Sequence, residues 1–302
     1  MKTLGIIVPF YRNLEYFYEL IDSIQGQSSS SYEVLIVDDS GKGVIQRIVD
    51  EEIKDDRFSF IENDVNQGPF ASWNIGLDEM LDRQKYSLLS IVHADDVLDH
   101  DYVKNSLSYL SMYPEVDVFY SKVKLIGAKG KRVFSIQDFY KRVGSGFRGN
   151  KPIHTSSDNG LARILGNNHI FCPTMVFNAN MFYRIKFNDQ WKMVSDLEFV
   201  ATALLEGRSF LQMTDKNYYY RRHGNNLTAE LTRSTKRFEE EVELYKDLED
   251  LCRRSGFLMS AEVAKKARII KLHILYRMSV ALTRFDLASM RRLIRVLRSV
   301  GK

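Results

Sequence analysis

Two pairs of adjacent carboxylates have the residue types and the positions to do chemistry. Asp38-Asp39 follows the apolar run EVLIV, and Asp95-Asp96 follows the apolar run SLLSIV. Adjacent carboxylates at the end of a buried strand are costly unless a cation or hydrogen-bond donors meet them. A hard divalent cation that bridges a diphosphate would meet this need. Each pair also has a plain structural interpretation, because the first suits a turn and the second could cap a helix.

The segments that would position these carboxylates alternate between strands and helices. Apolar runs predict strands at 4–8, 33–37, 58–62, 87–92 and 116–121. Helical patterns fall between them, namely a helix with Phe17, Leu20, Ile21 and Ile24 on one face and helices near 42–54, 69–83 and 100–113. Such alternation predicts an α/β fold with a mostly parallel sheet covered on both faces. Ligands bind at the carboxyl ends of strands in these sheets, where both acidic pairs would lie.

The rest of the chain divides into three stretches. Residues 127–170 are rich in Gly, Ser, Asn and basic residues, including Gly144-Ser145-Gly146, and we expect a loop region there. Apolar segments resume at 170–187, a helix is predicted near 195–207, and the pattern beyond about 234 is helical. The fold is therefore predicted to end in a helical appendage.

Composition excludes several classes of protein. The chain has 302 residues, of which 44% are apolar and 27% charged, as is ordinary for a globular protein. Its two cysteines, Cys172 and Cys252, form no CxxC pair, which excludes a disulfide scaffold and a zinc ribbon. The start of the chain does not resemble a signal peptide, and no run approaches the roughly 18 apolar residues of a membrane span. We expect a cytoplasmic protein.

Seven short segments together resemble the family-2 glycosyltransferases, over residues 3 to about 228. In chain order they are IIVPFYRN at 6–13, VLIVDDS at 34–40, NQGPFASWNIGLDEM at 66–80, SIVHADDVL at 90–98, PTMVF at 173–177, SDLEF at 195–199 and YRRHGNN at 220–226. Each is weak alone, but all seven occur in the family's order and spacing. The resemblance implies a GT-A fold, with a catalytic domain at 1–230 and a basic helical extension at 231–302. Within the catalytic domain it implies a nucleotide-binding half at 1–125 and an acceptor-binding half at 126–230.

The resemblance assigns four residues to the nucleotide of a nucleotide-sugar donor. Pro9 and Tyr11 match the loop that cradles the base, and Asp39 matches the carboxylate that accepts its ring N–H. Asp95 matches the residue that binds the ribose hydroxyls. Uracil, thymine and guanine carry a ring N–H and neutral cytosine does not, so UDP- or dTDP-sugars are favoured, with UDP first. Arg12 stands where many members have Asn.

The same resemblance assigns the metal and the base. Asp96 would hold Mn²⁺ or Mg²⁺ between the two phosphates, and His223 matches a metal-ligating or diphosphate-contacting histidine. The metal would neutralise the leaving diphosphate. Asp196 matches the general base that activates the acceptor hydroxyl, ahead of Glu198. The chain departs from the family at His93, where many members have the first aspartate of the DxD element.

These assignments predict inverting transfer of one sugar to a glycan or lipid-linked acceptor in bacterial polysaccharide biosynthesis. Processive synthases carry a QxxRW element and membrane spans, and neither is found in the sequence. A nucleotidyltransferase is one alternative, although its glycine-rich phosphate loop is missing after the first strand. A non-catalytic scaffold of the same fold is another. A nucleic-acid partner is not expected, because the basic tail has few interleaved aromatic residues.

Four other side chains have structural interpretations beside functional ones. Trp73 lies on an apolar helix face and is expected in the core, whereas Trp191 could stack on a sugar. His169 could line the acceptor pocket or simply order a loop. Cys172 is expected to be a small buried residue.

The C-terminal tail is strongly basic. Residues 261–302 hold eleven Lys or Arg and two acidic residues, a net charge of +9, so the first 260 residues carry −5 of the total of +4. The segment 286–300 predicts a helix with Leu287, Met290, Ile294 and Leu297 on one face and Arg291, Arg295 and Arg298 on another. Such a helix suits the inner face of an anionic membrane. Packing on the catalytic domain, or a homodimer contact, is the alternative.

Overall fold

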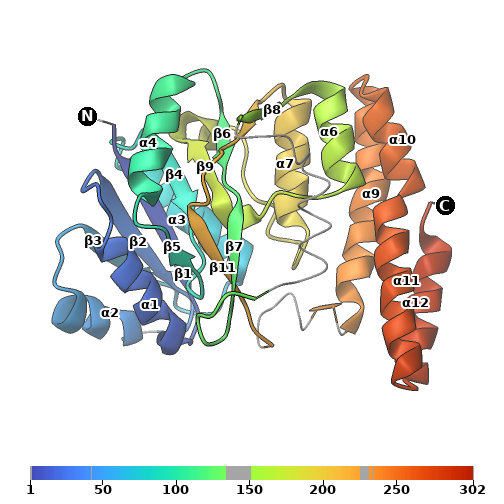
Figure 1. Ribbon diagram of the computed structural model, residues 1–302, viewed down its shortest axis with the longest axis horizontal. Helices are drawn as coiled ribbons and strands as arrows, with labels where there is room; N and C mark the ends of the chain where they lie inside the picture. The colour runs from blue at the N-terminus through green and yellow to red at the C-terminus, as the bar shows by residue number, and fades with distance from the viewer. Residues whose placement is uncertain (1, 42, 134–150, 225–230, 233, 302) are drawn as a thin grey trace.

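The computed structural model describes residues 2–41, 43–133, 151–224, 231–232 and 234–301 (Figure 1). An eight-stranded sheet forms its centre, in the order β3-β2-β1-β4-β9-β6-β10-β8. Its strands are β1 Leu4–Phe10, β2 Tyr32–Asp38, β3 Phe58–Glu62, β4 Leu88–Ile91, β6 Val118–Tyr120, β8 Ile153–Thr155, β9 Met175–Asn178 and β10 Phe210–Gln212. The first four neighbours are parallel, and β9 is inserted antiparallel between β4 and β6. This confirms the predicted α/β class.

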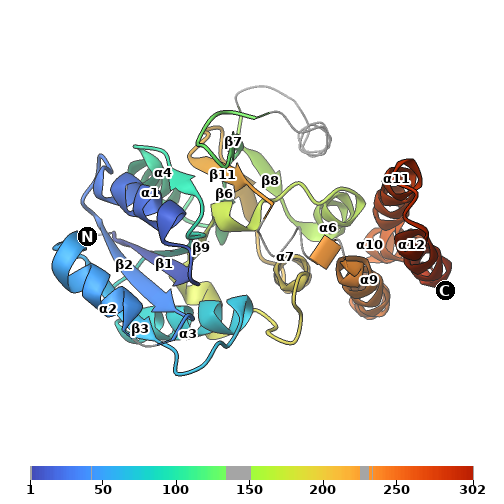
Figure 2. The ribbon, with the colours of Figure 1, turned by 90° about the horizontal axis from the view of Figure 1, so that it is seen from below.

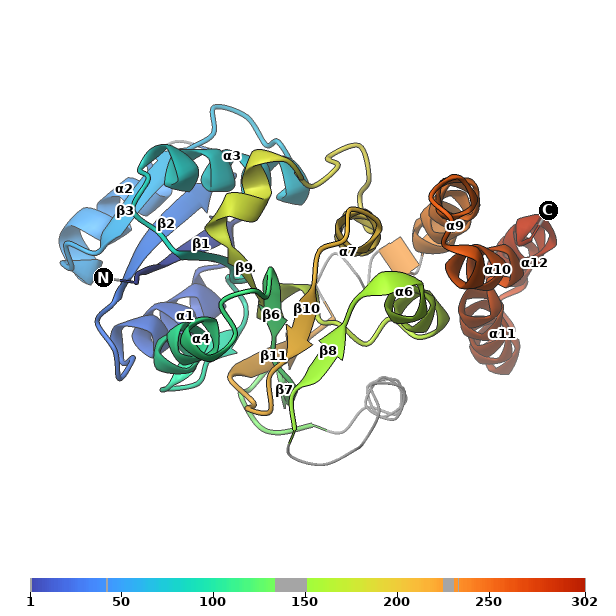
Figure 3. The same ribbon diagram turned by 90° about the horizontal axis from the view of Figure 1, so that it is seen from above.

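Helices cover both faces of the parallel half. Figure 3 shows α1, Leu14–Gln25, and α4, Tyr102–Met112, on one face, with α3, Pro69–Asp82, on the other. The short α2, Val44–Ile48, continues into a π-helical turn at Val49–Ile53, where one helix was predicted. The apolar face predicted for α1 is buried as expected, and β1 is buried along most of its length. Because these strands are parallel, β1, β2 and β4 end at one edge of the sheet.

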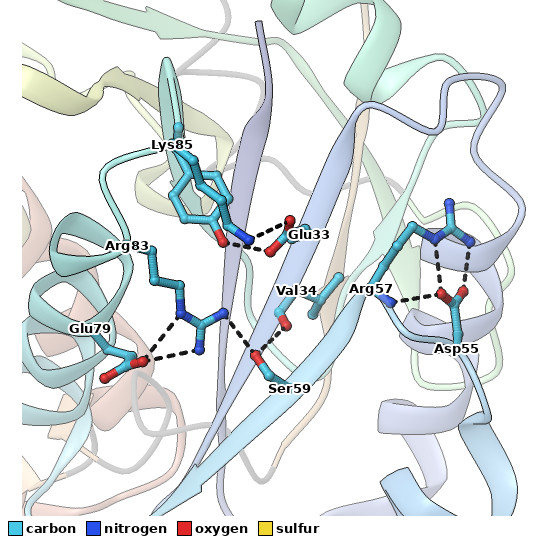
Figure 4. A network of polar contacts seen from close by, with 9 residues as sticks. Glu33, Val34, Asp55, Arg57, Ser59, Glu79, Arg83 and Lys85 are labelled. Carbon is cyan, nitrogen blue, oxygen red and sulfur yellow. Dashed lines mark hydrogen bonds and ion pairs between the residues drawn. The ribbon is translucent and has the colours of Figure 1, made fainter. Parts of the chain in front are cut away.

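A polar network holds the opposite edge, where β2 and β3 begin (Figure 4). Arg83, just after α3, donates to Glu79 and to the Ser59 hydroxyl, which donates in turn to the Val34 carbonyl. Lys85 pairs with Glu33 at 2.7 Å. Such half-exposed pairs each contribute about 1 kcal/mol or less. They fix α3 against the sheet at the edge remote from the carboxyl ends.

A second, three-stranded sheet lies beside the carboxyl ends of the central strands. It consists of β5 Val97–Leu98, β11 Tyr218–Arg222 and β7 Val123–Gly127, with β11 in the middle. β5 directly follows Asp95-Asp96, and β11 runs antiparallel to it. This pairing brings residues 218–223 to the acidic pair.

The segment 127–170 was predicted to be a loop region, and this is wrong for its second half. Residues 151–170 contain β8 and the helix α6, Ser157–Gly166. Leu161, Ile164 and Leu165 are buried at helical spacing, against α10. The glycine-rich stretch at 144–150 lies outside the described residues.

The helical prediction for the C-terminal extension is confirmed. Figures 1 and 2 show its helices grouped beyond the end of the central sheet. They are α9 Lys236–Arg254, α10 Leu258–Lys266, α11 Arg268–Thr283 and α12 Leu287–Ser299, and they follow α7 Ser195–Leu205 in the chain. One hydrophobic core runs from α6 and α7 through α9 to α11 and α12. None of the described helices is long and apolar enough to cross a bilayer.

Candidate active site

Asp95 and His223 meet at the carboxyl end of β4. The Nε2 atom of His223 lies 2.8 Å from Oδ2 of Asp95, although 128 residues separate them in the chain. Burial alone would raise the pKa of Asp95, but the hydrogen bond from His223 and the charges of both nearby histidines lower it. Tyr16 packs its ring against that of His223, with centroids 5.1 Å apart. Asp95 therefore remains a carboxylate directed at an imidazole, an arrangement suited to a divalent cation.

Asp96 is turned inward, away from this pair. Its side chain is 1% exposed, Oδ2 accepts from the Tyr218 hydroxyl at 2.9 Å, and Oδ1 accepts from the Arg221 backbone N–H at 2.7 Å. Burial, followed by the negative charge of Asp95, raises the pKa of Asp96 well above its usual range. Both oxygens of Asp96 thus already hold β11 in place. Its assignment as the metal ligand stays a prediction.

Arg221 completes this arrangement, and the sequence reasoning gave it no role. Its side chain is fully buried, donates to the Asp95 carbonyl at 2.7 Å and pairs with Glu19 at 2.6 Å. Its guanidinium also lies 4.4 Å from the centre of the Tyr16 ring. The buried cation holds the backbone of the acidic pair against α1. Its place in the YRRHGNN segment was the only signal available in the sequence.

His93 lies beside the acidic pair and is a third candidate metal ligand. Ligand atoms of His93, Asp95 and Asp96 all lie within 4.8 Å of one another. Burial lowers the pKa of His93, although the charge of Asp95 opposes this, and its Nε2 atom is buried without a hydrogen-bond partner in the described structure. Neutral imidazole and carboxylate oxygens are ligands that Mn²⁺ accepts. The residues present therefore fit a divalent cation.

Asp39 lies at the carboxyl end of β2 and orders the loop before α3. Its Oδ1 accepts from the Gln67 backbone N–H at 2.7 Å and from Asn63, and its Oδ2 accepts from the Gly68 backbone N–H at 2.9 Å. Each carboxylate oxygen can accept two hydrogen bonds, so Oδ2 retains capacity for a further donor. Asp38 is fully buried and accepts from the Ser40 backbone N–H. The two members of this acidic pair thus have different surroundings.

The end of β1 lies beside the same loop. Pro9 is the penultimate residue of β1, and Tyr11, just beyond it, is 49% exposed. The Arg12 backbone N–H donates to Ser40 Oγ at 2.7 Å, which ties the exits of β1 and β2 together. The Arg12 guanidinium lies over the Tyr11 ring. Tyr11 and the largely buried Asp39 therefore lie at the same edge of the sheet.

Asp196 and Glu198 both lie in the first turn of α7, in unlike surroundings. Asp196 is partly exposed, and its Oδ1 accepts from the next backbone N–H. Glu198 accepts from the Trp191 indole at 2.8 Å and from Asn188 at 3.3 Å. Burial raises the pKa of Glu198, although those two hydrogen bonds oppose it. Glu198 therefore fastens the loop before α7.

The four side chains with both a structural and a functional interpretation have different surroundings. Trp73 is buried, as predicted, and packs against His93. His169 is buried and lies 3.0 Å from the Asn167 carbonyl, which favours its structural interpretation. Trp191 is partly buried against the core with its indole committed to Glu198. Cys172 is only partly buried.

An α/β sheet with acidic pairs at its carboxyl edge, one of them beside a histidine, suits the binding of a nucleotide and a divalent cation. The profile described as "Glycosyl transferase family 2" matches residues 5–178, and the chain belongs to this family. Its relatives include named glycosyltransferases and uncharacterised ones. Poly(ribitol-phosphate) beta-N-acetylglucosaminyltransferase TarS of Staphylococcus aureus is 23% identical over 76% of this chain. An uncharacterised glycosyltransferase of Haemophilus influenzae is 31% identical over 67% of this chain and 62% of its own length.

The sequence match covers only part of TarS, whereas the structural match covers nearly the whole of this chain. The chain spans 37% of the length of TarS in the sequence comparison. The crystal structure of TarS residues 1–349 in complex with UDP-GlcNAc superposes with a TM-score of 0.63 at 17% identity. That superposition covers 99% of this chain and 92% of the crystallised one. The GT-A fold predicted from the sequence is thereby confirmed.

Proposed function

We propose that the protein transfers a single sugar from a UDP-sugar to a hydroxyl of a bacterial surface glycan, with inversion at the anomeric carbon. The observation that carries the proposal is the contact of Asp95 with His223 at the carboxyl edge of the sheet. Membership of the family and the likeness to a protein crystallised with UDP-GlcNAc support the donor class. A teichoic-acid acceptor is one option, because TarS and a Staphylococcus epidermidis poly(glycerol phosphate) polymerase are both relatives.

In this proposal Tyr11 and Asp39 bind the base. The half-exposed Tyr11 ring offers an apolar face for stacking, and the second lone pair of Asp39 Oδ2 can accept a ring N–H. Gln67 and Gly68, which donate to Asp39, fix the direction of that carboxylate before the donor binds. Such preorganisation lowers the ordering cost of binding.

Asp95 and His223 would hold a divalent cation, Mn²⁺ or Mg²⁺, with His93 nearby. A cation at this place neutralises the charge that develops on the departing diphosphate. Asp96 then acts as a positioning residue, because its two hydrogen bonds fasten β11, and with it His223, to the acidic pair. This differs from the metal role that the family resemblance implied for Asp96, and it rests on the burial of Asp96.

Asp196 would serve as the general base. It removes the proton from the acceptor hydroxyl as the oxygen attacks the anomeric carbon, and the sugar–phosphate bond breaks on the opposite side. Direct displacement with one base leaves the configuration inverted. The commitment of Glu198 to Trp191 and Asn188 supports Asp196 in this role. Arg237 lies close enough for the charge of Asp196 to contribute to the raised pKa of Arg237, after the larger effect of Glu241.

A donor assay with two matched variants tests the proposal. UDP release from UDP-GlcNAc and other UDP-sugars is measured with Mn²⁺, with EDTA, and with candidate poly(ribitol phosphate) or poly(glycerol phosphate) acceptors. We expect Asp196→Asn to lower turnover about 10²–10⁴-fold while UDP still binds, and Glu198→Gln to do less. The reverse order would move the base to Glu198. Full turnover in EDTA, or no UDP-sugar bound at all, would contradict the proposed function.

A further inference from the structure

An exposed apolar surface lies on the outer side of α11 and on the turn that joins α11 to α12. We call it the α11 patch, and it consists of Leu272, Leu275, Tyr276, Leu282, Phe285 and Leu287. Phe285, in the turn, is 88% exposed, and its neighbours Leu282 and Leu287 are 65% and 68% exposed. Scattered apolar residues are normal on a protein surface, but six exposed large apolar side chains on one helix and the adjoining turn favour an interaction site.

The opposite side of α11 is buried against the rest of the protein. Its buried residues are Ile270, Ile274 and Ala281. A helix that is apolar on opposite sides is normally covered on both. α12 does not cover the patch, because it packs inward through Leu293 and Val296. Among the described residues, the outer side of α11 is left exposed, so it can contact a partner.

The charge around the patch selects the partner. Residues 268–301 contain eight Arg or Lys and one acidic residue, Asp286, a net charge of +7. The arginines of α12 at 291, 295 and 298 are exposed, and no ion pair in the described part of the chain involves them. A second copy docking through this surface would bring two such charges together. An anionic surface gains from each of them.

We propose that the α11 patch docks on an anionic lipid surface, with Phe285 and its apolar neighbours entering the interface and the arginines meeting the headgroups. Aromatic and aliphatic side chains bordered by arginine are the chemistry of interfacial helices. Each basic residue near such a surface adds to the attraction. Of the stripe predicted from the sequence, Leu287 is exposed and belongs to the α11 patch, whereas Met290, Ile294 and Leu297 are half-buried, so the binding face lies on α11 and the turn.

The position of the patch agrees with this partner. In Figure 1 the α11–α12 turn and the carboxyl ends of the parallel strands lie on the same, lower side of the molecule. Figure 2, seen from below, shows that side with the C-terminal helices beside the sheet. A membrane that meets the turn would therefore lie on the side of the candidate active site. An acceptor held at that membrane would approach the site directly, a consequence that rests on the proposed function.

Vesicle co-sedimentation of the full chain tests the proposal without donor or acceptor. Vesicles of phosphatidylcholine with and without phosphatidylglycerol are the probes, at low and high salt. We expect binding to the anionic vesicles, release at high salt, and little binding to the neutral ones. Because no substrate is present, a failure here is distinct from a failure of the proposed function, which the UDP-release assay reports.

Point variants locate the contact. Phe285→Ser should weaken vesicle binding about tenfold, since the side chain no longer leaves water. The triple change Arg291→Gln, Arg295→Gln and Arg298→Gln should weaken it about fivefold per arginine. Tyr183→Ser removes another exposed aromatic residue, 64% exposed and remote from the C-terminal helices in the chain, and should change nothing. Circular dichroism confirms that each variant is folded.

Three results would overturn the proposal. One is the absence of binding to anionic vesicles. Another is an equal effect of Phe285→Ser and Tyr183→Ser. The third is a dimer in vesicle-free solution that Phe285→Ser dissociates, which would assign the patch to a second copy of the chain.

Discussion

Asparagine substitutions at Asp95 and Asp96 separate the two roles that adjacent carboxylates can have. Asp96 accepts from the Tyr218 hydroxyl and from the Arg221 N–H, with 1% of its side chain exposed. Asparagine offers one acceptor oxygen and one NH₂ group, so if the oxygen stays on the Arg221 N–H, the Tyr218 hydroxyl must turn and its O–H loses its acceptor. A buried group left unsatisfied costs about 1–3 kcal/mol. We expect Asp96→Asn to lower the free energy of unfolding by that amount.

Asp95→Asn should behave in the opposite way. The Asp95 side chain is 28% exposed, and the carbonyl oxygen of asparagine can still accept from His223. The loss of stability should therefore stay within about 1 kcal/mol, as for most half-exposed positions. The change, however, removes the negative charge of one of the two proposed cation ligands. We expect UDP binding by Asp95→Asn to gain nothing from added Mn²⁺.

The assay combines urea unfolding with calorimetric titration of UDP, with and without Mn²⁺. Asp50→Asn, an exposed position on the π-helical turn, controls for the removal of one negative charge. Asp96→Asn is titrated at a temperature at which urea unfolding shows it fully folded. The reasoning is refuted if Asp96→Asn is as stable as the parent and loses the Mn²⁺ dependence while Asp95→Asn keeps it. That outcome would restore Asp96 as the metal ligand.

Two further substitutions test residues that the sequence did not reveal. Glu240→Ala removes the carboxylate that accepts from the backbone N–H groups of Lys192 and Met193, so kcat should fall while UDP affinity, by titration, is unchanged. Equal losses in both would mean a general folding defect. Arg221→Met leaves the Asp95 carbonyl without its guanidinium donor, whereas the half-exposed Glu19 can turn to water, and urea unfolding should show a loss of about 1–3 kcal/mol. A loss below about 1 kcal/mol would mean that water replaces the guanidinium.

The parallel half of the fold could be predicted because its information is local. Each strand there is a short apolar run, and each intervening helix has its own apolar face, as α1 shows. The missed helix α6 is different. Its buried residues lie among serine, aspartate, asparagine and glycine, and they are covered by α10, about a hundred residues further on. Local composition favoured a loop, and a distant partner made it a helix.

The site could be predicted only where a family pattern supplied the long-range information. Asp95 and His223 are far apart in the sequence, yet each stood in a recognisable segment, and the structure brings them together. The distinct surroundings of Asp95 and Asp96 could not be predicted, because they depend on how β11 pairs with β5. Glu240 lay outside every segment of the resemblance. Its contact with the loop before α7 depends on the packing of the extension.

That packing brings the C-terminal extension against the loop before α7 and the first turn of α7. Glu240 on α9 binds the backbone of residues 192–193, and Arg237, one turn earlier, lies near Asp196. The same helix packs on α10, α11 and α12 through a core that is continuous with the catalytic part. A chain shortened to end near residue 260 would expose that core and release the loop before α7, so its failure to bind vesicles would reveal nothing about the α11 patch. Substitutions at Phe285 leave α9 in place, so their effect on vesicle binding reports on the contact at the turn itself.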